Sequence, residues 1–195
     1  MQHIALLSQK VWLTNIPLLA YNQIAFTMSS DLLPMIGAIA LPHLGGIVGA
    51  KLYPATQPWY EGLRKSRLVP PNWVFPIAWT SLYTGMGYAS FLVWKSGGGF
   101  EGDARIALFL YGSQLLLNWA WTPIFFGAHN IKGSLIDMAM LVPTAASCAL
   151  AFNKVNNTAG WLMAPYVVWL GFATYLNLRM LQLNGDNQKP AKAKN

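Results

Sequence analysis

The chain has 195 residues, of which 54% are hydrophobic and only 10% are charged, and its mean hydropathy is positive. Soluble domains carry about 25% charged residues, so this composition excludes an ordinary soluble protein and indicates a membrane protein. A bilayer core needs about 20 residues per helix, and the length therefore suits four to six spans with short loops and no soluble domain. The formal net charge of +7 requires an explanation from topology or from a partner.

Cysteine and histidine usage excludes two kinds of site. Cys148 is the single cysteine of the sequence, so it cannot form a disulfide within the chain. No group of cysteines and histidines has the spacing of a metal site, and we expect neither a bound metal nor a required cofactor.

The apolar segments predict an all-α membrane protein, a bundle of five transmembrane helices. An N-terminal extension, residues 1–31, is interrupted by polar residues and by Pro17, and it matches neither a signal peptide nor a transit peptide. We expect it to be flexible or interfacial. The transmembrane domain is residues 32–183, with spans expected at about 32–52, 73–94, 105–126, 133–152 and 159–183. The tail, residues 184–195, carries three lysines and is expected to be disordered.

Two features of the first span and its loop indicate how the bundle is built. Gly45, Gly46 and Gly49 form a small-residue face, which allows close helix approach and is a candidate surface for an oligomer such as a homodimer. The following connection, 53–72, is polar and basic. Loops longer than about a dozen residues are usually functional or disordered, and we expect this one to form a lid over the mouth of the bundle.

The distribution of basic residues predicts the orientation of the spans. Nine of the thirteen lysines and arginines fall on the side that holds the first loop, the third loop and the tail. The positive-inside rule therefore places the C-terminus in the cytosol and favours an odd number of spans. Because the charges are spread over short loops, they indicate anionic lipid headgroups and exclude nucleic acid as a partner.

Ionisable residues within the expected spans are few. Asp137 is the one acidic residue well inside a span, and either a helix dipole with a polar partner stabilises it or it binds a ligand or a proton. His43 is interpreted either as an interhelical hydrogen-bonding group or as a ligand of a haem-like iron. His129 falls in an interfacial turn. Neither serine nor cysteine has a base at a spacing that supports covalent catalysis.

A carboxamide and two tryptophans stand together in the third span. An unpaired amide costs several kcal/mol in hydrocarbon, so Asn118 is expected to face protein, water or a ligand. Trp119 and Trp121 point about 200° apart on a helix, and at most one of them faces the bundle interior squarely. Trp79 and Trp169 also lie within spans, away from the interfaces. Flat aromatic walls suit a planar or steroidal ligand, although aromatic filling of a bundle explains them equally well.

Several short motifs follow one another along the chain. They are Trp59-Tyr60, Pro70-Pro71-Asn72-Trp73-Val74-Phe75, Trp79-Thr80-Ser81-Leu82-Tyr83, Met86-Gly87-Tyr88, Asn118-Trp119-Ala120-Trp121 and Pro123-Ile124-Phe125-Phe126-Gly127. In these motifs the sequence resembles the translocator protein family, also called the peripheral benzodiazepine receptor or tryptophan-rich sensory protein family. The resemblance covers about residues 36–183.

The resemblance implies a five-helix bundle that binds cholesterol, porphyrins and benzodiazepine-type ligands in the outer mitochondrial membrane. The ligand-binding positions that it implies are Ala50, Phe75, Trp79, Tyr83, Asn118, Trp119, Trp121, Asp137, Met140, Trp169, Ala173 and Leu176. The cholesterol-recognition segment of the family implies a second set near the end of the fifth span, formed by Leu170, Tyr175, Leu178 and Arg179.

The chain departs from the mammalian pattern of the family at three positions. Leu178 stands where the cholesterol segment has its central tyrosine, while Tyr175 still supplies the pattern Leu170-x4-Tyr175-x3-Arg179. Gly133 replaces a tryptophan at the start of the fourth span, and Pro76 precedes the usual proline position by one residue.

The residues and the resemblance together predict a non-enzymatic membrane receptor or transporter for lipophilic ligands. The resemblance further implies a role in mitochondrial sterol transport and porphyrin handling. Its expected partners are cholesterol and other lipids, porphyrins and the membrane, with porphyrin or haem as a ligand. The principal alternative is an enzyme that degrades porphyrin oxidatively or with light, using Trp79, Trp119, Trp121 or Trp169 as relays. A third interpretation is a scaffold that forms oligomers through its small-residue faces.

Overall fold

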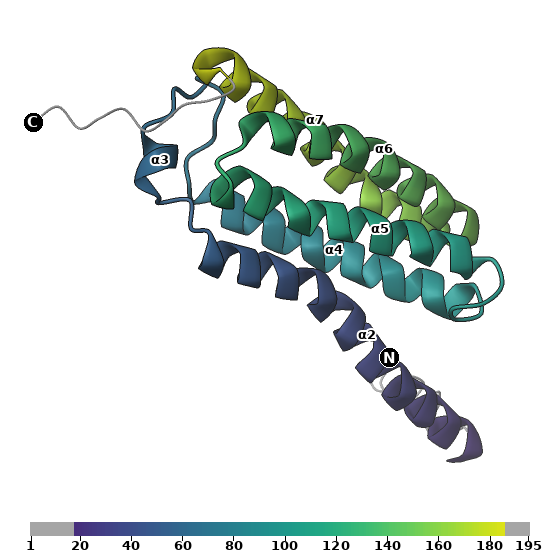
Figure 1. The fold of residues 1–195 in the computed structure, drawn as a ribbon. Coiled ribbons are helices and arrows are strands. Elements are labelled where there is room, and N and C mark those ends of the chain that lie inside the picture. The colour runs from purple at the N-terminus through teal and green to yellow at the C-terminus, as the bar shows by residue number, and fades with distance from the viewer. Residues whose placement is uncertain (1–17, 186–195) are drawn as a thin grey trace, which may run out of the picture. The chain divides into compact units, whose positions relative to one another are not determined.

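The structure, a computed structural model, describes residues 18–185, and every regular element among them is helical (Figure 1). The helices are α2 (Leu18–Leu52), α3 (Pro58–Glu61), α4 (Val74–Ser96), α5 (Ala104–Thr122), α6 (Ile131–Val155) and α7 (Asn157–Asn184), and a π-helical turn, η1, covers Pro123–Gly127. The expectations for the first 17 residues and for the tail beyond residue 185 lie outside the described residues.

The first helix differs from its predicted bounds. α2 begins at Leu18, so residues 18–31 of the expected extension belong to a regular helix. Asn22 and Gln23 do not interrupt it, because polar side chains leave the backbone hydrogen bonds of a helix intact. The other expected spans correspond to α4, α5 with η1, α6 and α7, whose ends differ by a few residues from the predicted ones.

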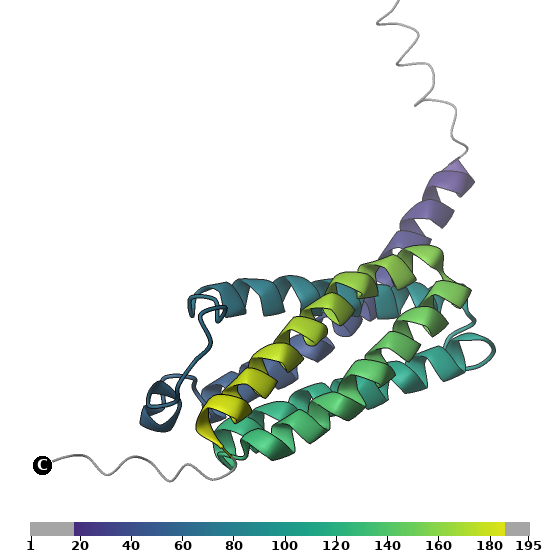
Figure 2. The same ribbon diagram turned by 90° about the horizontal axis from the view of Figure 1, so that it is seen from above.

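The chain divides into two compact units, Met1–Gly37 and Ala38–Asn195. In the first unit, residues 18–37 are the N-terminal part of α2. In the second unit, α4, α5, α6 and α7 surround a common core, in which each helix lies against the next and α7 lies against α4 (Figures 1 and 2). The largest side chains of this core include Tyr166, Phe152 and Met86, all fully buried.

Glycines let the remaining part of α2 lie close to α4 and α5 within the second unit. A Cβ atom at Gly45 would overlap the indole of Trp119, and one at Gly46 would contact the ring of Tyr83. Gly49 faces Thr122 in the same way. These glycines therefore pack against the chain's own helices, and they do not supply the oligomer surface that the scaffold interpretation expected.

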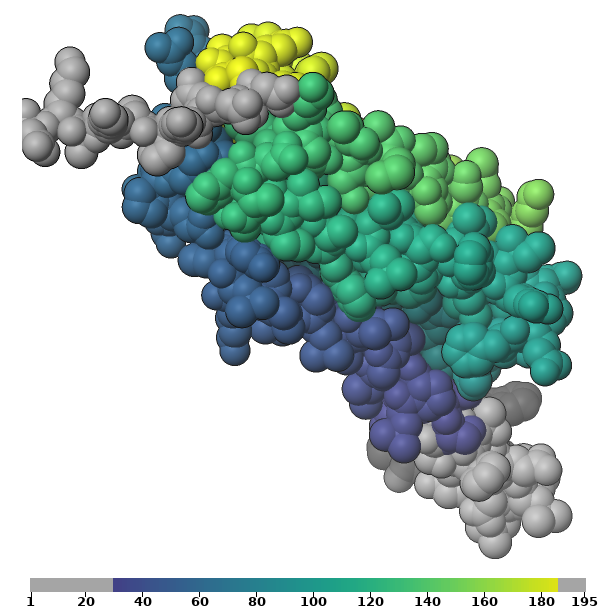
Figure 3. All heavy atoms as spheres, viewed as in Figure 1, coloured from purple at the N-terminus to yellow at the C-terminus, as the bar shows by residue number. Residues whose placement is uncertain are grey.

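Outward-facing side chains of the second unit are largely apolar. Ile106, Phe109 and Leu116 of α5 and Leu150 of α6 are all more than half exposed. Figure 3 shows the outer face of α5 and α6 as a continuous surface of side chains. A large exposed apolar surface of this kind fits a helix that faces lipid.

Within residues 18–185, three helices are long and apolar enough to cross a membrane by length and composition alone. They are the Ser30–Leu52 part of α2, α6 and α7. α5 carries Gln114 and Asn118 in its interior turns, and such side chains lower its hydropathy. The all-helical class is confirmed, while the count of five spans stays a prediction.

The start of α6 depends on one side chain. Asn130 is its N-cap, and the Asn130 Oδ1 atom accepts a hydrogen bond from the Gly133 backbone N–H at 2.7 Å. Replacing Asn130 by alanine should lower the free energy of unfolding by about 1 kcal/mol, whereas Asn130→Gly should cost only a few tenths. Thermal unfolding in detergent compares the two variants, and equal losses would contradict the capping role.

Candidate functional site

The second unit encloses a cavity of about 510 Å³. Its wall is formed by the last turns of α2, the loop 53–72, α4, α5, η1, α6 and α7. Pockets for drug-sized ligands have volumes of about 300–1,000 Å³ and are mostly apolar. The cavity therefore has the size of a site for one small lipophilic molecule.

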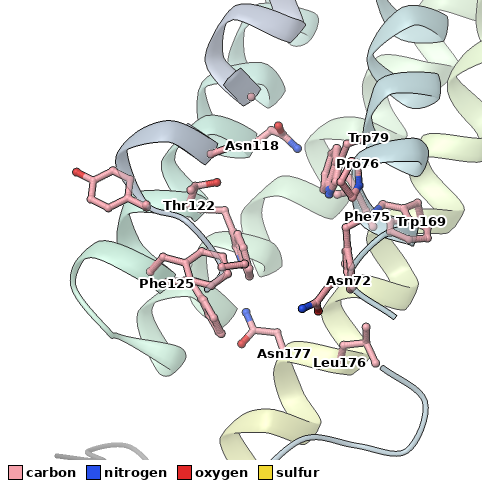
Figure 4. Close-up of a pocket in the computed structure, with 18 of the residues that line it drawn as sticks. Asn72, Phe75, Pro76, Trp79, Asn118, Thr122, Phe125, Trp169, Leu176 and Asn177 are labelled. Carbon is pink, nitrogen blue, oxygen red and sulfur yellow. The ribbon is translucent and has the colours of Figure 1, made fainter. Parts of the chain in front are cut away.

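Aromatic rings form two facing walls of the cavity. Figure 4 shows Phe75, Trp79 and Trp169 on one side and Phe125 on the other. The Trp79 and Trp169 rings are 6.5 Å apart and nearly perpendicular, and Phe75 lies 6.1 Å from Trp169. Trp121 stacks on Phe125 with a centroid distance of 4.7 Å. Such walls bind flat apolar molecules by stacking and by area burial.

The inner end of the cavity is a chain of neutral hydrogen bonds between α4, α5 and α7. Tyr83 donates its hydroxyl hydrogen to Asn118 Oδ1 at 2.8 Å, and Asn118 Nδ2 donates to the Tyr166 hydroxyl at 3.2 Å. Tyr166 in turn donates to Gln114 Oε1 at 2.8 Å. Both the oxygen and the nitrogen of the Asn118 amide therefore have protein partners.

A second carboxamide stands near the mouth. We assign the Asn177 amide of α7 the orientation in which both of its atoms have partners. In this orientation it accepts hydrogen bonds from Trp121 Nε1 at 3.2 Å and from Ser134 Oγ at 3.0 Å, and it donates to the Ile131 carbonyl at 3.3 Å. This network holds the Trp121 indole in place at the cavity wall. Asn72 also projects into the cavity on this side, as Figure 4 shows.

The loop 53–72, here called the strap, closes the cavity at the end where α7 finishes. Trp59 and Tyr60 of α3 are buried, and Trp59 stacks on His129 at a centroid distance of 4.3 Å. Burial raises the pKa of the Tyr60 hydroxyl above its ordinary value. The side-chain amide of Asn184 is hydrogen-bonded to the strap: it donates to the Arg64 carbonyl and accepts from the Arg64 N–H, both at 2.9 Å.

Most of the expected ligand-binding residues meet at this cavity. Those that line it are Ala50, Phe75, Trp79, Tyr83, Asn118, Trp121, Trp169, Ala173 and Leu176. Trp119, Asp137 and Met140 do not line it. The nine lining positions come from four long helices, so only the folded bundle brings them together.

Each of the other three expected residues lies outside the cavity for a different reason. Trp119 points away from Trp121 as the helix period requires, and it lies against Gly45 of α2. Met140 is half exposed on the outer face of α6. Asp137 is buried on α6, and its Oδ2 atom has no hydrogen-bond partner.

The expected cholesterol segment is divided between two faces of α7. Leu170 is buried and lines the cavity, whereas Tyr175 and Leu178 are about 40% exposed on the outer face. Residues five apart on a helix point about 140° away from each other, which separates Leu170 from Tyr175. Arg179 donates to Gln182 one turn further along. An outer sterol site would therefore be formed without Leu170.

The wall also contains residues outside the expected ligand-binding set. One is His43, which the sequence had left open as a hydrogen-bonding group or an iron ligand. Others that sequence reasoning did not select are Thr122, Phe125, Met138, Leu141 and Asn177. Helical spacing was the available signal for two of them, because Phe125 follows Trp121 by four residues and Asn177 follows Ala173 by four.

Known proteins are similar in sequence to the part of the chain that forms this cavity. A model of the TspO/MBR family matches residues 38–183, which begin where the second unit begins. The chain is 42% identical over 163 residues to a protein named Translocator protein from Bos taurus, covering 83% of this chain and 94% of the relative. It is 42% identical over 151 residues to the Translocator protein of Homo sapiens, covering 77% of this chain and 89% of that protein. A Tryptophan-rich sensory protein from Cereibacter sphaeroides is 39% identical over 145 residues, covering 74% and 87%.

Proposed function

This chain belongs to the TspO/MBR family of membrane proteins, and from that premise we propose that it is a receptor and transporter for lipophilic ring compounds. The proposed ligands are cholesterol, porphyrins and benzodiazepine-type molecules, bound in the cavity between the helices. The observation that carries the proposal is the aromatic cavity of about 510 Å³ with a hydrogen-bonding inner end.

The proposal includes a membrane arrangement. The chain is a multi-pass membrane protein, and we propose that α2, α4, α5, α6 and α7 each cross the bilayer. The outer mitochondrial membrane is its proposed location, as the resemblance to the family implies. The basic strap and the C-terminus would face the cytosol by the positive-inside rule.

A tryptophan substitution tests the binding site. Trp79→Ala should weaken binding of protoporphyrin to nanodisc-reconstituted protein by about ten-fold, because one aromatic wall loses its central ring. Tryptophan fluorescence quenching measures the affinity. Trp161→Ala is the matched control, since Trp161 is 70% exposed on the outer surface of α7. Equal affinities in the wild type and Trp79→Ala would place the ligand elsewhere.

One observation favours the enzymatic alternative. Trp169, Trp79 and Tyr83 form a ladder of rings along the wall, with successive centroid distances of 6.5 and 5.1 Å. Rings at this separation would relay an electron from the protein to an excited or oxidised ligand. The alternative predicts light-dependent loss of the porphyrin absorption band, which disappears when Trp79 and Trp169 become Phe. A band that stays constant during saturable binding supports the receptor instead.

A further inference from the structure

The strap contains a group of basic residues outside the cavity wall. Arg64, Lys65 and Arg67 surround Ser66 within four consecutive positions, and none of the four lines the cavity. Arg64 and Arg67 are exposed. Among residues 18–185, their guanidinium groups have neither a hydrogen-bond acceptor nor an acidic partner. Two cations of the strap can therefore bind an anion without giving up a contact within this part of the chain.

Ser66 contributes little to the packing of the strap. It is partly exposed, in a segment without regular secondary structure. Its Oγ atom accepts a hydrogen bond from the Leu68 N–H at 3.3 Å, and its side chain makes no other hydrogen bond within the described residues. Exposed loops are where enzymes most readily reach a folded chain. The Ser66 hydroxyl is therefore accessible to a modifying enzyme.

Lys65, in contrast, is held by contacts with α3. Its ammonium group donates to the carbonyls of Tyr60 and Glu61 at 2.6 and 3.3 Å, and it lies 4.4 Å from the Tyr60 ring centroid. Moving it to another partner would break these contacts. An anion on Ser66 is therefore expected to bind the two arginines first.

The two arginines belong to differently restrained parts of the strap. The backbone of Arg64 is fixed to the end of α7 by its two hydrogen bonds with the Asn184 amide. Arg67 lies beyond this anchor, in the stretch that leads to the cavity-lining residue Val69. An anionic group on Ser66 that binds both guanidinium groups would link the anchored part of the strap to the part that covers the cavity.

We propose that Ser66 is a phosphorylation site for a protein kinase that recognises basic residues on both sides of its acceptor, and that the phosphate holds the strap closed. The Ser66 Oγ atom attacks the γ-phosphorus of ATP, an O–P bond forms, the bond from this phosphorus to ADP breaks, and the hydroxyl proton passes to the base of the kinase. A phosphoserine carries a charge of about −1.5 to −2 at pH 7 and forms charge-assisted hydrogen bonds with arginine.

The two parts of this proposal rest on different premises. Modification in the cell rests on the proposed orientation, which places the strap in the cytosol, where ATP is available. The effect on ligand exchange rests on the proposed receptor function. The presence of phosphate and the rate of ligand exchange are therefore measured separately.

The first experiment locates the phosphate. Nanodisc-reconstituted protein is incubated with ATP and the catalytic domain of protein kinase C, and tandem mass spectrometry identifies the modified residue. Stoichiometric phosphate at Ser66 is expected, and Ser66→Ala should eliminate it. A synthetic peptide of residues 61–70 reports the reactivity of the isolated segment. Phosphate on Thr56, the other serine or threonine of the strap, or phosphate on the peptide alone, would overturn the site.

The second experiment measures ligand exchange. Stopped-flow quenching with protoporphyrin should show association and dissociation about five-fold slower in the phosphorylated protein than in the unmodified protein, because new pairs between phosphate and arginine order the loop. The same slowing is expected when phosphoserine is introduced at position 66 during translation, and it should disappear when Arg64→Gln and Arg67→Gln are combined with it. Arg105→Gln is the matched control, since Arg105 is exposed at the start of α5.

The remaining outcomes separate the parts of the proposal. Equal exchange rates with and without phosphate would overturn the closing effect, and faster exchange would show that the phosphate draws Lys65 away from α3 instead. Slowing that persists without both arginines would overturn their role. Absence of saturable protoporphyrin binding by the unmodified protein would overturn the proposed receptor function, while phosphate mapped to Ser66 would still establish the modification site.

Discussion

Replacing Gly87 by alanine is expected to destabilise the protein by about 2–3 kcal/mol, near the upper end of the range for overpacking. A Cβ atom at this position of α4 would lie 2.6 Å from the Cα atom of Ile39 and 2.7 Å from the Ala38 carbonyl oxygen. Both are backbone atoms of α2, so no side-chain rotation relieves the clash, and the two helices must separate.

The expected separation also affects the ligand. His43, Gly46, Ile47 and Ala50 of α2 form part of the cavity wall, so a displaced α2 should lower ligand affinity as well as the unfolding temperature. Thermal unfolding followed by tryptophan fluorescence, together with porphyrin titration, measures both effects in one preparation.

Gly112→Ala is the matched control for this experiment. Gly112 lies in the middle of α5, and a Cβ atom there would have no neighbour within 4 Å. Alanine is favoured over glycine in a helix by about 1 kcal/mol, so this variant should be as stable as the wild type or more stable. Similar unfolding temperatures for Gly87→Ala and Gly112→Ala would show that α2 and α4 do not pack as described.

Releasing the strap is the second change with a large expected effect. Asn184 is buried at the end of α7, and its amide makes two hydrogen bonds to the Arg64 backbone and a third to the Met180 carbonyl. Asn184→Leu removes these bonds and leaves the Arg64 N–H and C=O groups without their partner. A buried unsatisfied polar group costs about 1–3 kcal/mol, and we expect a loss of stability of about that size.

The ligand should then exchange faster. Tyr53, Thr56, Tyr60, Val69 and Asn72 belong to the strap or its ends and line the cavity, so a detached strap opens the mouth. Stopped-flow quenching should show that association and dissociation rates both rise, with dissociation rising more because the bound ligand also loses contacts with the strap.

An exposed amide two residues earlier supplies the control. Gln182 is exposed and accepts a hydrogen bond from Arg179 on the surface of α7. Gln182→Leu should change neither the unfolding temperature nor the exchange rates, because exposed polar pairs contribute little. Exchange rates in Asn184→Leu that match those of the wild type would remove the strap from the route of ligand entry.

Much of the fold was predictable because its determinants are local. The apolar segments and their turns located the helices that became α4, α5, α6 and α7 within a few residues. The first span was expected at about 32–52, and the apolar part of α2 that is long enough to cross a membrane is Ser30–Leu52. The helix itself begins earlier, at Leu18, because polar residues such as Asn22 lower the hydropathy without breaking the helix. The expected lid is consistent with the strap, whose residues line one end of the cavity.

The candidate site was predictable in part. The resemblance to a known family and the rarity of amides in apolar helices both selected Asn118, and the structure places it at the inner end of the cavity. Asp137 and Met140 were both expected to bind the ligand. They lie three residues apart on α6, yet Asp137 is buried and Met140 faces outward. Helical rotation alone was not enough to assign their faces, because which face is interior depends on neighbouring helices.

The sequence by itself determined that this is an apolar, helical membrane protein with small residues at the close approach of α2 and a wall rich in tryptophan. These properties follow from composition and from periods of a few residues. The tertiary structure decided that Trp121 rather than Trp119 lines the cavity, that the wall is uncharged, and that Asn184 holds Arg64 across a sequence separation of 120 residues. Such pairings depend on how whole helices pack, and no local pattern in the chain encodes the partner.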